Sequence, residues 1–188
     1  MAVAMIKKTF LSADEFLSDV WLLAVRIAES GWKPDLLVAL WRGGAPVGVG
    51  VHEFLKMIGW GFRHIAIKCA SYDGIGENGG EVRFDGCEEV FAGIKAGEKI
   101  LVVDDVFDTG KTALAVKKRL EAAGAEMRMA TVYWKPENNQ TELSPDYFVR
   151  RLSNDWIVFP HEMEGLSDEE LARKDPKLAE LLISLRDT

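Results

Sequence analysis

The chain has 188 residues, of which 48% are hydrophobic and 28% charged, a composition typical of one soluble globular domain with a real core. Its formal net charge of −7 excludes a broad electrostatic footprint for nucleic acid, although it leaves room for a local basic patch. Cys69 and Cys87 lie outside any metal-binding or disulfide pattern, which fits a reducing cytoplasm, and no apolar run predicts a signal peptide or a membrane anchor.

The N-terminal part predicts a helix followed by a buried strand. Ser12-Ala-Asp-Glu15 is a capping box, and apolar residues then recur at helical spacing, so a helix is expected over about 13–30. Pro34 ends this pattern, and the apolar run Leu36–Trp41 indicates the first buried strand.

A glycine loop separates this strand from the next helical pattern. Arg42, Gly43 and Gly44 stand directly after the strand. Two glycines let backbone amides approach an anion while Arg42 adds positive charge, so the loop is a candidate phosphate site. A plain glycine turn with a surface arginine is the alternative.

The next segment predicts a second strand and a long loop. Residues 62–70 alternate in polarity and indicate a strand with mixed faces. Ser71–Gly80 contains four glycines and nothing that would anchor it to a core, so we expect a mobile loop there. An ordinary long hairpin is the alternative.

Residues 100–112 form the most informative stretch of the chain. The apolar run Ile100–Val103 ends in two acids, and Thr109-Gly-Lys-Thr112 opens an amphipathic segment that closes at Gly124. This pattern predicts a strand, a loop and a helix, with the loop at the carboxyl end of a parallel strand. Open α/β sheets bind their ligands at that edge.

The residue types of this loop suit a ligand with both a phosphate and a diol. The segment 109–112 offers hydroxyls, a flexible glycine and backbone N–H groups at a helix N-terminus, which suit a phosphate. Asp104 and Asp105 would repel a phosphate but can accept hydrogen bonds from sugar hydroxyls or hold hydrated Mg²⁺. A Walker loop is a poor match, because no glycine closely precedes Gly110. A capped turn with solvent-facing acids is the remaining alternative.

The C-terminal third predicts short strands and a helical tail. Met127–Trp134 indicates a buried strand that ends in Lys135, and Tyr147–Val149 a short strand after a polar loop. The segment 155–163 contains an aromatic residue and an acid in an edge strand, a pattern that on its own more often reflects packing. A second capping box at Ser167 begins a helical tail over about 167–188, with Pro176 starting its second helix.

Val102 to Thr112, Val-Val-Asp-Asp-Val-Phe-Asp-Thr-Gly-Lys-Thr, resembles without a gap the phosphoribosyl-pyrophosphate (PRPP) signature of type I phosphoribosyltransferases. The resemblance implies an α/β fold with a central parallel sheet flanked by helices and a small hood over the base site. It implies a single domain over 1–188, whose hood is formed largely by about 137–166.

The resemblance also implies roles at the PRPP site. Asp104 and Asp105 would bind the ribose hydroxyls and Mg²⁺, and Asp108 would lie near the attacking base as a catalytic residue. The 5′-phosphate would be bound by Thr109, Gly110, Lys111 and Thr112.

Pyrophosphate would be bound by the loop of Arg42, Gly43 and Gly44, where the family often has a non-proline cis peptide, here expected at Trp41–Arg42. Ser71 and Tyr72 match a Ser-Tyr pair that closes over PRPP in the family. Lys68 is a further candidate for pyrophosphate, with a plain surface lysine as the alternative.

The base site resembles that of the bacterial xanthine-guanine type. Lys135 would donate to the exocyclic oxygen of a 6-oxopurine, since an ammonium has only donors and disfavours the amino group of adenine. Trp156 would stack on the base, Ile157 would offer its backbone carbonyl, and Glu162 takes the acid position. His161 departs from the family pattern, because an aromatic residue, commonly Trp, is usual there.

These matches imply Mg²⁺-dependent transfer of the phosphoribosyl group from PRPP to guanine, xanthine or hypoxanthine in purine salvage, by a cytoplasmic homodimer or homotetramer. One alternative is a PRPP-sensing regulator that binds nucleic acid elsewhere, and another is transfer to a non-purine base. The net negative charge argues against the regulator, as does the presence of both Lys135 and Trp156, so no nucleic-acid partner is expected. No membrane partner is expected either.

Overall fold

The computed structural model describes residues 8–71, 82–153 and 155–186, and its contacts divide the chain into two compact units. The larger unit spans residues 17–154, and the smaller one combines residues 1–16 with 155–188. Each unit is described by itself. The segment 137–154, which the family resemblance assigned to the hood, falls in the larger unit, and the single domain stays a prediction.

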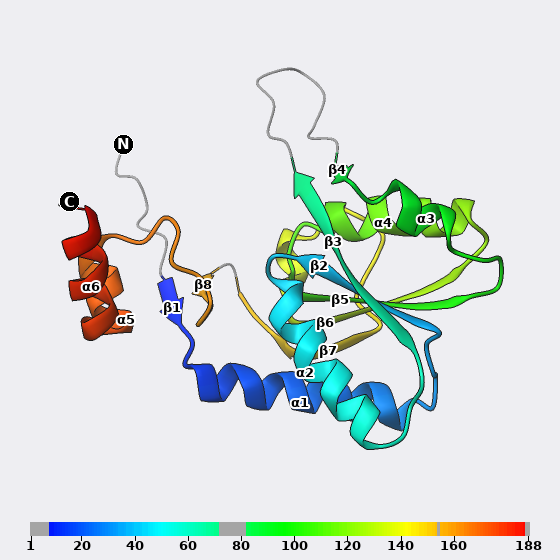
Figure 1. Ribbon diagram of the computed structural model, residues 1–188, viewed down its shortest axis with the longest axis horizontal. Helices are drawn as coiled ribbons and strands as arrows, with labels where there is room; N and C mark the ends of the chain where they lie inside the picture. The colour runs from blue at the N-terminus through cyan, green and yellow to red at the C-terminus, as the bar shows by residue number, and fades with distance from the viewer. Residues whose placement is uncertain (1–7, 72–81, 154, 187–188) are drawn as a thin grey trace. The chain divides into compact units, whose positions relative to one another are not determined.

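A six-stranded sheet of order β4-β3-β2-β5-β6-β7 forms the centre of the larger unit (Figure 1). All neighbouring strands are parallel except β4, which pairs antiparallel with β3 at one edge. The strands are β2 (Leu36–Trp41), β3 (Arg63–Ser71), β4 (Val82–Asp85), β5 (Lys99–Phe107), β6 (Glu126–Trp134) and β7 (Tyr147–Arg151). The predicted α/β fold with a central parallel sheet is confirmed.

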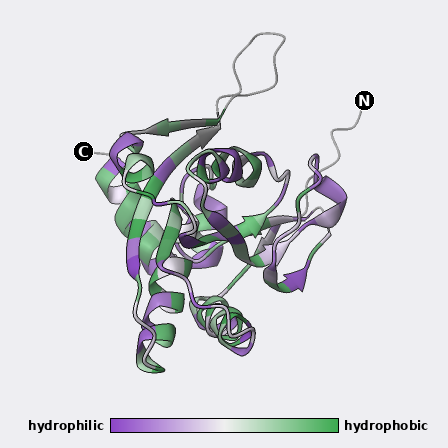
Figure 2. Cartoon of the chain, turned by 90° about the vertical axis from the view of Figure 1, so that its right-hand side faces the viewer, coloured by the Kyte–Doolittle hydropathy of each residue, from purple (hydrophilic) through white to green (hydrophobic). Residues whose placement is uncertain are grey.

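Helices cover both faces of this sheet (Figure 1). On one face lie α1 (Ala13–Glu29) and α2 (Gly44–Met57), and on the other lie α3 (Glu88–Ala92) and α4 (Lys111–Ala122). Figure 2 shows hydrophobic residues along the strands between these layers, as expected for strands that are buried on both sides. Within the described part of the chain, no helix is long and apolar enough to cross a membrane.

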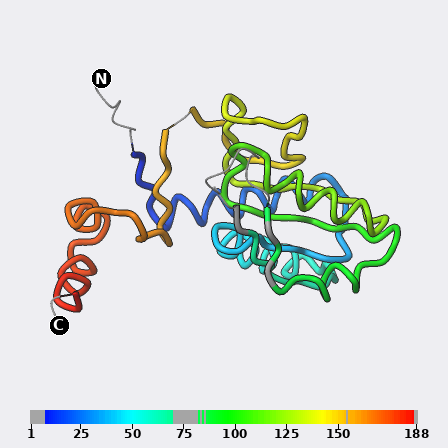
Figure 3. The backbone as a smooth tube through the Cα atoms, turned by 90° about the horizontal axis from the view of Figure 1, so that it is seen from above, coloured from blue at the N-terminus to red at the C-terminus, as the bar shows by residue number. Residues whose placement is uncertain are grey.

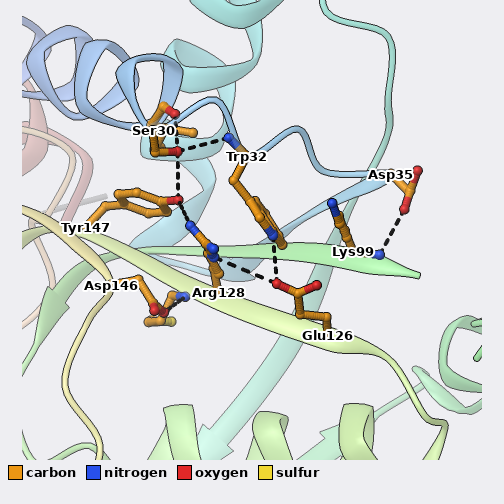
Figure 4. Close-up of polar contacts among 10 residues, drawn as sticks. Ser30, Trp32, Asp35, Lys99, Glu126, Arg128, Asp146 and Tyr147 are labelled. Carbon is orange, nitrogen blue, oxygen red and sulfur yellow. Dashed lines mark hydrogen bonds and ion pairs between the residues drawn. The ribbon is translucent and has the colours of Figure 1, made fainter. Parts of the chain in front are cut away.

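Polar contacts connect the strands near their amino-terminal ends (Figure 4). The indole N–H of Trp32 donates to Glu126 Oε1 over 2.7 Å, and Arg128 Nη1 donates to the Tyr147 hydroxyl over 2.6 Å. The Asp35 carboxylate accepts the backbone N–H of Lys99 over 2.9 Å. These hydrogen bonds therefore fix the amino-terminal ends of the strands, opposite the loops that follow β2 and β5.

An ion pair between a buried acid of α1 and an exposed arginine of β7 joins the helix to the sheet. Asp19 is 4% exposed, and Arg150 reaches its carboxylate with Nη2 at 2.7 Å from Oδ1 and Nε at 3.0 Å from Oδ2. The Tyr133 hydroxyl donates to Oδ2 over 2.8 Å. Because all three groups have partners, the charge of Asp19 is accommodated inside an otherwise apolar layer.

The smaller unit contains two short parallel strands and two helices. The strands are β1 (Lys8–Phe10) and β8 (Trp156–Val158), and the helices are α5 (Asp168–Lys174) and α6 (Pro176–Arg186). Ser167 Oγ accepts the N–H of Glu170 over 3.2 Å, and the Glu170 carboxylate accepts the N–H of Ser167 over 2.9 Å. The capping box and the helix start at Pro176 are confirmed.

Candidate active site

The carboxyl end of β5 carries the two adjacent acids. Asp104 is half-buried and Asp105 is 7% exposed, and Asp104 Oδ1 accepts the backbone N–H of Asp105 over 3.0 Å. Burial, together with the negative charge of Asp105, raises the pKa of the Asp104 carboxyl well above its usual range. Two acids held this close favour a ligand that brings hydroxyl donors or positive charge.

The glycine loop that follows β2 packs against this acid pair. A Cβ atom on Gly43 would overlap the Asp105 carboxylate, and one on Gly44 would overlap the Val103 carbonyl. Both glycines are therefore required for the close approach of α2 to the end of β5, a reason that sequence reasoning missed. The peptide bond Trp41–Arg42 is cis, as predicted.

The two loops meet because β2 and β5 are neighbours in the sheet. Ala39 of β2 is the register partner of Val103 of β5. The next strand in sequence, β3, pairs with one side of β2, whereas the later strand β5 pairs with the other side of β2. Such a reversal of strand order opens a crevice at the carboxyl ends of the two strands, the usual ligand site of open α/β sheets.

The segment 109–112 forms the beginning of α4. Gly110 is the N-cap residue, with a left-handed φ of 76°, and Lys111 is the first residue of the helix. The first N–H groups of a helix lack partners within the helix and carry partial positive charge. The N-cap Gly110 has no side chain to cap this helix, and Thr109 Oγ1 accepts the N–H of Lys111 over 3.5 Å, so the N–H groups that follow suit an anion such as a phosphate.

Lys135 and Asp108 form a second polar pair beside the phosphate loop. Lys135 is 6% exposed, its Nζ lies 3.4 Å from Asp108 Oδ2, and its backbone N–H donates to Phe107 O over 2.9 Å. Within the described residues, Asp108 Oδ1 is buried without a hydrogen-bond partner. The lysine at the strand end is thus a buried ammonium paired with an acid, and a surface lysine is excluded at this position. The second carboxylate oxygen of Asp108 is thus a buried acceptor whose bonding capacity is unused within the described residues.

The other predicted pyrophosphate residues lie on or after β3. Lys68 is exposed and is the register partner of Trp41, so it lies beside the strand end that leads into the glycine loop. Ser71 is the last residue of β3. Tyr72 and the rest of the predicted mobile loop lie outside the described residues, and that prediction stays open.

The predicted base-binding residues are divided between the two units. Lys135 belongs to the larger unit, whereas Trp156, Ile157 and Glu162 belong to the smaller one. Trp156 is 54% exposed, Ile157 is buried, and Glu162 Oε2 accepts the backbone N–H of Phe159 over 3.3 Å. A common base site for these four residues stays a prediction.

His161 contributes to aromatic packing in the smaller unit. Its ring stacks on that of Phe159 at a centroid distance of 5.4 Å, and it lies 5.6 Å from the ring of Phe16. A histidine thus takes part in the aromatic cluster at the position where the resemblance leads us to expect an aromatic residue.

Asp104 and Asp105 also form the candidate site for a magnesium ion. No cluster of three or more His, Cys, Asp or Glu residues within the described ranges could hold a metal ion. Mg²⁺ is usually bound by one or two carboxylates while substrate phosphates and water complete its octahedral shell. An acid pair beside a phosphate loop fits that manner of binding, in which the ion arrives with the substrate.

Comparison with known proteins agrees with this geometry. Residues 8–168, which extend over both units, match the sequence model of the phosphoribosyl transferase domain. The chain is 30% identical over 154 residues to a hypoxanthine-guanine phosphoribosyltransferase of Lactococcus lactis, and the match covers 81% of each protein.

Solved structures show the same architecture. The crystal structure of a purine phosphoribosyltransferase from Pyrococcus horikoshii aligns with a TM-score of 0.68 and 27% identity, covering 86% of this chain and 98% of that one. A protein from Neisseria gonorrhoeae with bound ppGpp aligns with a TM-score of 0.74 over 93% of this chain and 99% of that one. At 22% identity, the latter likeness concerns the fold alone.

Proposed function

This chain belongs to the phosphoribosyltransferase family, and we propose that it transfers the 5-phosphoribosyl group of PRPP to a 6-oxopurine, releasing pyrophosphate and a nucleoside monophosphate. The observation that carries the proposal is the meeting of the glycine loop, the acid pair and the α4 N-terminus at the ends of β2 and β5. The named activities of the relatives from L. lactis and P. horikoshii support a purine as the acceptor.

In the proposed complex, PRPP lies across both loops. The ribose hydroxyls donate to Asp104 and Asp105, and the 5′-phosphate accepts N–H groups of the segment 109–112. Pyrophosphate lies at Arg42 and the amides of Gly43 and Gly44, with Lys68, Ser71 and Tyr72 as further contacts. When bound by the acid pair and the substrate, magnesium supplies positive charge that neutralises the leaving pyrophosphate.

The reaction exchanges one bond at the anomeric carbon of the ribose for another. A purine nitrogen forms the new bond, the bond to the pyrophosphate oxygen breaks, and positive charge develops on the sugar. Asp108 takes the proton that the purine loses or stabilises the charge that develops there. Lys135 donates to Oδ2 of this acid, and Oδ1 has no hydrogen-bond partner within the described residues. Arg42 stabilises the growing negative charge of the leaving group.

The proposed base selection follows from hydrogen-bond complementarity on a ring stacked on Trp156. Lys135 offers only donors and suits the 6-carbonyl, whereas an ionised Glu162 offers only acceptors and suits an amino or ring N–H group. Guanine meets both demands. Hypoxanthine lacks the amino contact, xanthine places a carbonyl there, and adenine turns a donor toward Lys135.

A panel of bases tests the proposal directly. Pyrophosphate release from PRPP and Mg²⁺ is measured with guanine, xanthine, hypoxanthine, adenine, uracil and orotate. We expect guanine to be at least as good as the other two 6-oxopurines and adenine to be the worst purine. Equal use of adenine and guanine would remove the role given to Lys135. Release with uracil or orotate alone would move the acceptor out of the purine class.

A further inference from the structure

The turn formed by residues 139–143, here called the buttress turn, lies directly against the phosphate loop. The backbone N–H of Gln140 donates to Thr109 O over 3.0 Å. A Cβ atom on Gly110 would lie 2.5 Å from Thr141 Oγ1 and 2.7 Å from Asn139 Oδ1, so polar atoms of the buttress turn contact this glycine. Figure 3 shows the segment after β6 beside the beginning of α4.

Hydrogen bonds within the buttress turn hold its two polar side chains in place. Asn139 Oδ1 accepts both the N–H and the hydroxyl of Thr141, each over 3.0 Å. Asn139 Nδ2 donates to Leu143 O over 2.6 Å, and Thr141 Oγ1 accepts the N–H of Leu143 over 3.3 Å. The side chain of Leu143 packs on the hydrophobic core, which anchors the turn.

This bonding pattern distinguishes positioning from direct binding. The hydroxyl proton of Thr141 is used within the turn, and so are both acceptor sites of Asn139 Oδ1. Neither side chain carries a charge that would attract a phosphate. The turn therefore presents a neutral, internally bonded surface to Gly110.

We propose that Asn139 and Thr141 are positioning residues for the 5′-phosphate. They hold Thr109 and Gly110 in the conformation that keeps the first N–H groups of α4 together before PRPP binds. A loop that is ordered in advance loses little freedom on binding, whereas a loosened loop must be ordered by the ligand, which weakens affinity. This inference rests on the proposed function, because it assigns the phosphate to that loop.

The variant Thr141→Val tests the role, because it removes the hydroxyl and keeps the shape of the side chain. It leaves the N–H of Leu143 and one acceptor site of Asn139 without a partner. Calorimetry with guanosine and guanosine 5′-monophosphate isolates the part of affinity that comes from the phosphate. We expect affinity for the monophosphate to fall about tenfold while affinity for guanosine stays unchanged. The KM for PRPP should rise by a similar factor at nearly constant kcat.

Two variants serve as matched controls. Thr141→Ser keeps the hydroxyl and should restore affinity for the monophosphate to within about twofold. Ser144→Ala removes a hydroxyl from an exposed position close to the same turn and should change neither ligand's affinity.

The outcomes separate this inference from the proposed function. If the unmodified protein binds guanosine as tightly as its monophosphate, the proposed function itself is wrong. If it prefers the monophosphate and Thr141→Val keeps the full preference, only the positioning role is wrong. An equal loss of affinity for both ligands would indicate general damage and would also overturn the role.

A measurement on the unmodified protein applies even if Thr141→Val does not fold. The Gln140 amide should exchange slowly in the absence of ligand, because its hydrogen bond to Thr109 already exists. Exchange as fast as that of an exposed loop until PRPP is added would contradict a preformed phosphate loop.

Discussion

Lys135 Nζ lies 3.4 Å from Asp108 Oδ2, with the lysine side chain only 7% exposed and the acid 39% exposed. The ammonium is therefore held in a fixed direction by a carboxylate from the preceding loop. A donor that is oriented before the base arrives discriminates between a carbonyl and an amino group better than a mobile surface lysine would.

Replacement of this lysine should relax base preference. Lys135→Gln should narrow the gap between guanine and adenine, because an amide can accept a hydrogen bond as well as donate one. An unpaired buried polar group costs about 1–3 kcal/mol, so the ratio of kcat/KM values should change by about five- to 150-fold. Lys68→Gln is the control, because an exposed lysine on β3 should affect both bases equally. An unchanged ratio in Lys135→Gln would exclude contact with the 6-position.

The acid pair should control binding of PRPP. Asp104→Asn with Asp105→Asn removes both carboxyl groups at the end of β5, and kcat/KM for PRPP should fall at least about a hundredfold. The fall should persist at saturating Mg²⁺, because each amide offers the ribose hydroxyls one neutral acceptor oxygen in place of a charged carboxylate and turns an NH2 donor toward them. Steady-state kinetics with varied PRPP and Mg²⁺ measures both effects. Unchanged kinetics in the double variant would remove the PRPP site from β5.

The glycine that touches Asp105 should tolerate no side chain. Gly43→Ala introduces a Cβ that overlaps the Asp105 carboxylate, so either the acid or the start of α2 must move. We expect kcat/KM for PRPP to fall about tenfold or more, since the site depends on positions held to within about 0.5 Å. Gly61→Ala is the matched control, because nothing lies within 4 Å of a Cβ at that position. Equal activity of both variants would show that the close contact between Gly43 and Asp105 is not needed for activity.

The ion pair of Asp19 should contribute to stability. Arg150→Ala leaves a carboxylate that is 4% exposed without its cation. Because the Arg150 side chain is itself 60% exposed and water screens the pair, the free energy of unfolding should fall by about 1–2 kcal/mol. Lys118→Ala changes an exposed lysine of α4 and should cost no more than about 0.5 kcal/mol. Urea denaturation measures both. Similar small values for both variants would mean that the ion pair contributes nothing measurable to stability.

The buried strands could be predicted because their sequence leaves few alternatives. Leu36–Trp41 is an apolar run bounded by a proline on one side and glycines on the other, and the structure has β2 with the same bounds. The end of the strand over Met127–Trp134 is also correct, and its start lies one residue earlier. The short strand β1 was not predicted, because a segment of three residues shows no clear hydrophobic periodicity and its partner, β8, lies near the other end of the chain.

Side-chain partners distant in sequence could not be predicted. Asp19 is visible as an acid within the apolar stripe of α1, but its partners Tyr133 and Arg150 lie 114 and 131 positions further along. The glycine loop was correctly placed after β2, yet the contact of Gly43 with Asp105 depends on the pairing of β2 with β5. The buttress turn appeared only as a polar loop, because nothing in its sequence indicates that it touches Gly110.

The pairing of β2 with β5 has a consequence for folding. Their register partners, such as Leu36 and Ile100, are distant in the chain, so the glycine loop and the phosphate loop come together only when this non-local pairing forms. A ligand that bridges the two loops therefore has no binding site in a partly folded chain. At about a hundred times its Kd, such a ligand stabilises the native state by about 2.7 kcal/mol. PRPP should accordingly slow hydrogen exchange throughout the central strands, far beyond the amides that it touches.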